Sequence, residues 1–161
     1  MEEQEVNVEH LHEIVHEQAH KSLWAEKVAL TTALLAVFAA ISSLLSTYES
    51  DQAILFRIEA SDRWSYYQAK GIKGMVTQET AEKARYKDEQ EKIREEAEAT
   101  THQSEHSLHL HEFFAYAVTI FQVATAIGAI AVLVKKKYFW YTSVTLGTIG
   151  IGLIIKAVTL L

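Results

Sequence analysis

Three apolar runs without a charged side chain constrain this chain more than any other feature. They cover residues 28–48, 113–134 and 138–155, and none of them contains Asp, Glu, Lys, Arg or His. Each is close to the roughly 20 residues that an α-helix needs to cross a hydrocarbon core of ~30 Å. All 21 acidic residues and all 8 histidines lie in residues 1–27 and 49–112. The pattern predicts an all-α integral membrane protein with transmembrane helices at 28–48, 113–134 and 138–161.

Two missing residue types narrow the chemistry further. The chain contains no cysteine, which excludes disulfides, thiolate metal sites and cysteine nucleophiles. It contains no proline, so nothing forces a break in a long helix. The formal charge of −6 argues against a nucleic-acid partner, which requires clustered basic residues. Residues 1–27 lack the basic start of a secretory signal, so we interpret 28–48 as a retained span.

The two charged stretches carry helical periodicity. Residues 1–27 predict an amphipathic, acidic and His-rich N-terminal helix, with a narrow seam at spacings of three and four. Residues 49–112 predict an extramembrane antiparallel hairpin, a thin coiled coil whose turn we place near 71–76, where Gly71 and Gly74 lie. Its two seams consist of Ala53, Phe56, Ala60, Trp64 and Tyr67 on the outgoing arm, and Tyr86, Gln90, Ile93, Ala97, Thr100, Ser104 and Ser107 on the returning arm.

The two arms of this hairpin differ in length. As helices, residues 49–70 would extend roughly 33 Å and residues 77–112 roughly 54 Å. We therefore expect either a bend near Thr100–Ser107, where polar residues replace helix formers, or an offset start of the second arm.

Basic residues predict the orientation in the membrane. Lys135, Lys136 and Lys137 form the short loop between the second and third spans, and Lys21 and Lys27 flank the first span on the same side. The opposite side carries only Arg57 and Arg63 near the membrane. The positive-inside rule then places the N-terminus and the 135–137 loop in the cytoplasm.

The N-terminal helix contains two overlapping H-E-x-x-H strings, at His12–His16 and His16–His20. On a helix this spacing can hold zinc beside a glutamate base, as in metalloproteases. A segment with four His and six Glu in twenty residues matches the pattern easily, however, and no other acid or His lies on that side of the membrane beyond the N-terminal helix itself. We favour a solvated or subunit-contacting face over a divalent-metal site, and we expect no enzyme activity.

A second histidine stripe, at His102, His106 and His109, precedes the second span. It would lie on the other side of the membrane from the first stripe, so the two sets cannot form one site. A membrane-surface collar of neutral imidazoles is the simpler interpretation, and proton or metal sensing is the functional one, because histidine titrates near neutrality.

Polar and small residues interrupt the apolar runs. Thr119, Gln122 and Thr125 recur every three residues in the second span, and they would either hydrogen-bond to a neighbouring helix or line a pore on a symmetry axis. Small residues that favour close helix packing are Thr32, Ala36, Ala39 and Ser43 in the first span and Gly147, Gly150 and Gly152 in the third. No acid or base lies in the middle of a span, which argues against a proton-coupled pump.

The most distinctive string in the hairpin is residues 61–70. Trp64 and Tyr67 share a face suited to a contact with the returning helix, while Tyr66 stands at i,i+4 from both Asp62 and Lys70. Structural packing is the simpler role for these residues, and binding of a partner is the alternative.

Several strings together resemble the bacterial DUF4337 family of membrane proteins. They are Leu11-His12-Glu13-x-x-His16-Glu17, the apolar start 28–37, the string 60–70 with Asp62, Trp64, Tyr66, Tyr67 and Lys70, and Phe139-Trp140-Tyr141. The resemblance implies a bacterial inner-membrane protein and carries no catalytic residues.

These features leave two main functional hypotheses. The preferred one is a homo-oligomer in the lipid bilayer that conducts or senses a small cation, without a cofactor. The alternative is a non-conducting scaffold whose hairpin binds another envelope protein. A zinc metalloprotease is the weakest of the three.

Overall fold

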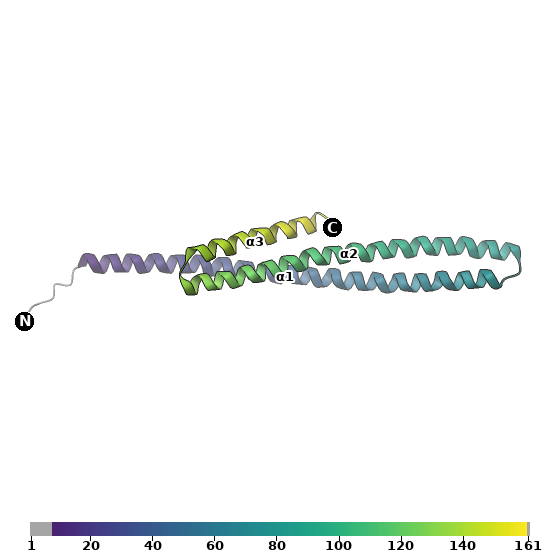
Figure 1. The fold of residues 1–161 in the computed structure, drawn as a ribbon, viewed down its shortest axis with the longest axis horizontal. Helices are drawn as coiled ribbons and strands as arrows, with labels where there is room; N and C mark the ends of the chain where they lie inside the picture. The colour runs from purple at the N-terminus through teal and green to yellow at the C-terminus, as the bar shows by residue number, and fades with distance from the viewer. Residues whose placement is uncertain (1–7, 161) are drawn as a thin grey trace, which may run out of the picture. The chain divides into compact units, whose positions relative to one another are not determined.

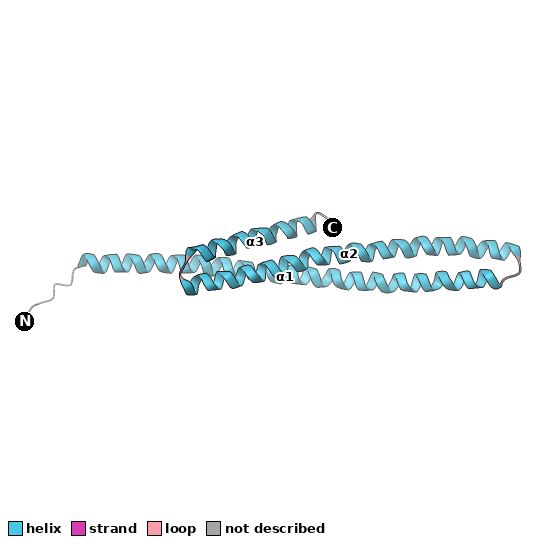
Figure 2. Ribbon diagram, viewed as in Figure 1, coloured by secondary structure: helices cyan, strands magenta, loops and turns pink. Residues whose placement is uncertain are grey.

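The computed structural model describes the backbone of residues 8–160 and the side chains of residues 23–160, and it is helical throughout apart from two short connections. Figure 1 shows three helices: α1 (Val8–Val76), α2 (Thr80–Val134) and α3 (Lys137–Val158). Figure 2 shows that the described residues contain no strand. The all-helical fold class predicted from the sequence is confirmed.

Each of the three helices is long and apolar enough to cross a membrane. The apolar run 28–48 lies within α1, 113–134 forms the end of α2, and 138–155 lies within α3. The structure therefore places the three predicted spans in three different helices.

Helix α1 is longer than any of the segments predicted for it. It joins the described part of the N-terminal segment, the first span and the outgoing arm of the hairpin in one helix. The sequence contains no proline to interrupt it, and its first glycine is Gly71. The seam of the N-terminal segment falls on side chains outside the described residues.

The hairpin turn lies later than predicted. Gly71 and Gly74 are both helical, and the connection to α2 consists of residues 77–79. A glycine inside a helix costs only ~1 kcal/mol relative to alanine, so contacts with a neighbouring helix can outweigh it. The predicted turn near 71–76 is thus corrected to residues 77–79.

The bend expected near Thr100–Ser107 is absent, because α2 is one helix from Thr80 to Val134. The offset start resolves the difference in arm length instead. The outgoing arm extends to Val76 and the returning arm begins only at Thr80. The last residues before the second span then lie beside the end of the first, where His111 contacts Ser46.

The chain divides into two compact units, to which α1 and α2 both contribute. Unit 1 comprises the described parts of Met1–Ile41 and Tyr116–Leu153, and unit 2 comprises Ser42–Ala115 with the described part of Ile154–Leu161.

Segments of all three helices form unit 1. Its core contains Val28, Leu35 and Phe121, with Phe121 fully buried and stacked on Phe38 at 5.8 Å between ring centres. Helix α2 crosses close to α1, since a Cβ added to Gly128 would lie 2.7 Å from Oγ1 of Thr32. Helix α3 closes the unit, and Ser143 donates a hydrogen bond of 2.7 Å to the carbonyl of Ala124.

Unit 2 is an antiparallel pair of helical segments from α1 and α2 with the end of α3. Small residues at heptad spacing fill its seam, including Ala53, Ala60 and Ala97, as the sequence predicts. Ser104 is buried and donates to the carbonyl of Ala53 at 2.8 Å. A second cluster of buried apolar residues consists of Leu110, Phe114 and Ala157.

Candidate functional site

The polar residues of the second span lie on two sides of α2. Thr119 and Gln122 are exposed on the surface of unit 1, whereas Thr125 is partly buried. The hydroxyl oxygen of Thr125 is buried and has no hydrogen-bond partner among the described residues. The Gln122 side chain likewise makes no hydrogen bond within the described residues. The structure therefore brings Thr119 and Gln122 together on an open face and turns Thr125 inward.

The interior of unit 1 offers no polar path. Fully buried apolar residues fill the contact between its helices, among them Val28, Phe121 and Ala124. Two polar groups near it are paired: Ser143 bonds the carbonyl of Ala124, and the Trp140 indole nitrogen donates to Thr31 at 3.1 Å. The Thr125 hydroxyl is an isolated exception. Any conducting path would therefore run along the outside of this unit.

The predicted small-residue face of the first span is only half correct. Ala39 is buried and Thr32 partly buried, but Ala36 and Ser43 are exposed. The buried face includes Val28, Leu35, Ala39 and Ser42 instead. Its spacing of four and three is a heptad, and the prediction departed from it by one residue at Ala36 and Ser43.

The three glycines of the third span differ in their roles. A Cβ on Gly147 would lie 2.5 Å from Leu35, and one on Gly150 would lie 2.8 Å from the ring of Phe121. A Cβ on Gly152 would meet nothing within 4 Å. Gly147 and Gly150 therefore permit close packing within unit 1, and Gly152 does not.

The aromatic string of unit 2 forms two contacts. Trp64 and Tyr67 are partly buried and meet edge to face, with 5.5 Å between ring centres. Tyr66 is exposed, and the Lys70 ammonium lies 5.3 Å from the centre of its ring. Asp62 is exposed on the same helix. The i,i+4 contact of Tyr66 with Lys70 is thus present in the structure.

Lys70 is also the centre of an ion pair between α1 and α2. Its ammonium lies 2.5 Å from a carboxylate oxygen of Glu89. The hydrogen bond with Glu89 raises the pKa of Lys70, and the same bond lowers the pKa of Glu89. Arg63 makes a comparable bridge to Glu96 and bonds Glu59 on its own helix, and these carboxylates raise the pKa of Arg63.

A buried polar stretch of unit 2 was not predicted from the sequence as a site. His111 Nδ1 donates to the Ser46 carbonyl at 2.8 Å and lies 3.0 Å from the Ser46 hydroxyl. Glu49 is only 7% exposed on the same seam. Continuing the heptad from Ser42 through Ser46 to Glu49 would have revealed it, because the seam does not stop at the end of the apolar run.

The histidines of the second stripe make separate contacts. His102 lies 3.5 Å from Glu105 and His109 lies 3.7 Å from Glu112, while His106 Nε2 donates to the Leu160 carbonyl at 3.2 Å. Among the described residues, no group of three or more His, Asp or Glu side chains is arranged to hold a metal ion. The first stripe, at His12, His16 and His20, lies outside the residues whose side chains are described.

Comparison with known proteins gives one match. The model of a family described as a domain of unknown function, DUF4337, matches residues 24–84 and 76–160. The two matched segments overlap at 76–84, which includes the turn between α1 and α2. Searches among curated proteins and among solved structures found no match.

Proposed function

We propose that this chain, which belongs to the DUF4337 family, forms a homo-oligomer in a membrane and conducts a small cation along its subunit contacts. The observation that carries the proposal is the exposed amide of Gln122 within an apolar span of α2. The described residues contain three candidate membrane-spanning helices, and three helices are too few to enclose a path alone.

An amide on the outside of a membrane helix is costly. Moving an amide into an apolar environment without a hydrogen bond costs on the order of 2–7 kcal/mol. A second subunit would remove this cost, because glutamine side chains hydrogen-bond across helix contacts in membranes. Thr119, exposed one turn away, extends the polar face.

The chemistry of this face suits a cation without fixing which one. Gln122 and Thr119 offer neutral oxygen atoms, which can replace part of the hydration shell of an ion. The hairpin segment 49–112 carries fourteen acids against nine Lys and Arg. This excess of negative charge would raise the cation concentration near one end of the conducting path.

We place the protein in a bacterial inner membrane with its N-terminus in the cytoplasm. The support is the basic loop 135–137 together with Lys21 and Lys27. Single cysteines at Ser61 and Lys136 in this cysteine-free chain should then react with an impermeant reagent from opposite sides of sealed vesicles.

Cation flux tests conduction directly. Purified protein in liposomes should pass at least one of K⁺, Na⁺ or H⁺, and Gln122→Leu should abolish this flux. Thr148→Val is the matched control, because Thr148 is exposed on α3 in the same unit. Equal inactivity of wild type and Gln122→Leu towards all cations would rule out conduction.

Cross-linking tests the oligomer separately. Gln122→Cys should form a disulfide-linked dimer on oxidation, whereas Ile149→Cys, exposed on α3, should not. Cross-linking without flux would leave an oligomer that does not conduct, and absence of both would overturn the proposal.

One observation favours a scaffold as the second candidate. Ile54, Leu55 and Ile58 are 56%, 59% and 54% exposed on α1, beyond the end of the first apolar run. Neighbouring apolar side chains outside the bilayer are typical of a protein contact. A photo-cross-linker at Leu55 should then capture one envelope protein, and Ile58→Asp should abolish capture. A cross-linker at exposed Lys92 is the control, and equal yields at both positions would count against the scaffold.

A further inference from the structure

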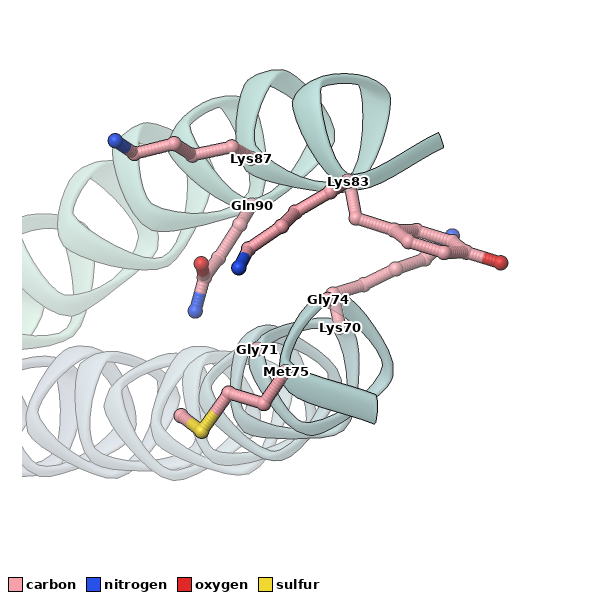
Figure 3. Close-up of a pocket in the computed structure, with 8 residues that line it drawn as sticks. Lys70, Gly71, Gly74, Met75, Lys83, Lys87 and Gln90 are labelled. Atoms are coloured by element: carbon pink, nitrogen blue, oxygen red, sulfur yellow. The ribbon is translucent and has the colours of Figure 1, made fainter. Parts of the chain in front are cut away.

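A small pocket lies at the tip of the hairpin in unit 2, between the end of α1 and the start of α2. Its volume is about 180 Å³. Figure 3 shows the side chains that line it, with Lys83, Lys87 and Gln90 on α2 facing Gly71, Gly74 and Met75 on α1. The contributing side chains are basic, amide, phenolic or apolar, and none is a carboxylate.

The lysines of the pocket are not equivalent. Lys70 is paired with Glu89 and lies 5.3 and 5.4 Å from the ring centres of Tyr66 and Tyr86. Lys83 and Lys87 have no acidic side chain within 4.0 Å among the described residues. Lys83 also stands in the first turn of α2, where the helix dipole already makes the potential positive. This end of the pocket therefore carries uncompensated positive charge.

Two of the acids near Lys83 have other partners, whereas exposed Glu79, four residues before it, has no ion-pair partner within 4.0 Å among the described residues. The Tyr86 hydroxyl donates to Glu82 at 3.1 Å, and Arg85 lies 3.7 Å from the same carboxylate. Glu89 is held by Lys70. No acidic side chain of the described residues thus lies within 4.0 Å of Lys83, and its charge is open to a group from outside the chain.

Gln90 and two glycines shape the rest of the pocket. The Gln90 amide nitrogen donates to the Tyr67 carbonyl at 3.3 Å, which uses one of its two N–H groups. In Figure 3 the ends of Gln90 and Lys83 point into the same space, while the ammonium of Lys87 points away from it.

Gly71 and Gly74 both lack a side chain that would enter the pocket, but packing requires glycine at only one of the two positions. A Cβ at Gly71 would lie 2.6 Å from the Gln90 amide nitrogen, so glycine is needed there for the amide. A Cβ at Gly74 would lie 3.6 Å from Tyr86, an ordinary contact, so packing does not require glycine at that position.

We propose that this pocket binds a phosphate group, held by the Lys83 ammonium and the second N–H of Gln90, with Lys87 able to swing in from the rim. A phosphate has oxygen acceptors for both donors, and charge-assisted hydrogen bonds to it are the strong class. The pocket volume of about 180 Å³ is several times the roughly 30 Å³ that one water molecule occupies, so the five heavy atoms of a phosphate group fit in it. Inorganic phosphate and a phosphate monoester share this chemistry.

Calorimetric titration of the full chain in phosphatidylcholine nanodiscs tests the proposal at constant ionic strength. One arm uses inorganic phosphate and the other glycerol phosphate. Saturable binding in either arm is expected, and the tighter arm identifies free phosphate or an ester as the natural form. Lys83→Gln should weaken binding by about tenfold or more, the loss of one charge-assisted hydrogen bond.

Two further variants separate a site from general attraction. Lys73→Gln removes the same charge from an exposed lysine of α1 that does not line the pocket, and it should leave the affinity within about twofold. Gly74→Leu changes no charge but fills the pocket, and it should abolish binding while the circular dichroism of the helices is retained.

Three results would overturn the proposal. They are the absence of saturable binding by wild type in both arms, equal losses for Lys73→Gln and Lys83→Gln, and undiminished binding by Gly74→Leu. None of these results bears on cation flux, so this proposal and the proposed function fail independently.

Discussion

Units 1 and 2 both pack long helices closely, but they do so with different residues. Unit 1 buries large side chains against glycines, as where Phe121 meets Gly150 and Leu35 meets Gly147. Unit 2 packs Ala and Ser in its seam and adds ion pairs across its edge, as between Lys70 and Glu89. The packing of unit 1 therefore relies on the complementary shapes of large side chains and glycines. The packing of unit 2 relies on small side chains combined with polar bonds.

The difference fits the solvents that we propose for the two regions. In lipid, apolar side chains gain nothing by leaving the solvent, so helices associate through close contact and hydrogen bonds. In water, a seam of small residues buries little apolar area, and polar bonds between the helices add stability and fix their register. Four experiments test this contrast, from the largest expected effect to the smallest.

The largest effect is expected for Gly150→Leu in unit 1. Its side chain would overlap the buried ring of Phe121, and overpacking of this kind costs about 1–3 kcal/mol. Gly152→Leu is the matched control and should cost nothing, because a Cβ there meets no atom within 4 Å. Unfolding of the purified protein in mixed micelles measures both, and equal losses would show that shape does not hold unit 1 together.

A smaller effect is expected for Ser104→Ala in unit 2. The substitution removes the buried hydrogen bond to the Ala53 carbonyl, which is worth about 1 kcal/mol. Ser65→Ala is the control, since Ser65 is exposed and bonds only the Ser61 carbonyl of its own helix. Denaturant unfolding followed by tryptophan fluorescence compares the two. Equal unfolding midpoints for the two variants would show that this hydrogen bond does not stabilise unit 2.

The two glycines at the hairpin tip should differ in how much stability alanine adds. Gly74→Ala should stabilise the protein by up to about 1 kcal/mol, because alanine favours the helix and its Cβ meets Tyr86 at an ordinary distance. Gly71→Ala should gain less or nothing, because its Cβ displaces the Gln90 amide from the Tyr67 carbonyl. Thermal unfolding of the full chain measures both, and a larger gain for Gly71→Ala would contradict this assignment.

The smallest effect concerns pH and the pair Lys70–Glu89. The pKa of Glu89 is lowered, so its contribution to stability is present above the ordinary value of 4.5 and is lost as the pH falls through the lowered pKa. The pKa of Lys70 is raised, so its contribution is present below 10.5 and is lost as the pH rises through the raised pKa.

Glu89→Gln should therefore flatten the dependence of the melting temperature on pH below neutrality. Glu91→Gln, which alters an exposed pair with Arg94 on the same helix, provides the comparison. A slope that is unchanged by Glu89→Gln would show that this ion pair adds nothing to the stability of unit 2.

Sequence periodicity predicted much of the seam in unit 2. Ala53, Ala60, Ala97 and Ser104 are buried as expected, because a spacing of three and four reports a helix face without any knowledge of the partner. The same reasoning wrongly placed Ala36 and Ser43 on the packing face of the first span. Within an apolar run every residue is permitted on every side, so hydropathy no longer marks the buried face.

For the candidate site, the sequence identified the residue types but not their partners. Gln122 and Thr119 were recognised as a polar face, and the structure added that this face is open while Thr125 turns inward. The contact of Ser46 with His111 spans 65 positions, and no local pattern encodes it. Functions proposed for these residues stay predictions until flux and cross-linking are measured.

The sequence by itself determined that this chain is helical and that three of its stretches can cross a membrane, because both properties depend on residues within one or two turns of each other. The tertiary structure decided where the hairpin turns, which glycines must be glycine and which charges pair. These features depend on the register between α1 and α2. That register is determined jointly by contacts between residues far apart in the chain: Tyr67 with Gln90, Ala53 with Ser104 and Ser46 with His111.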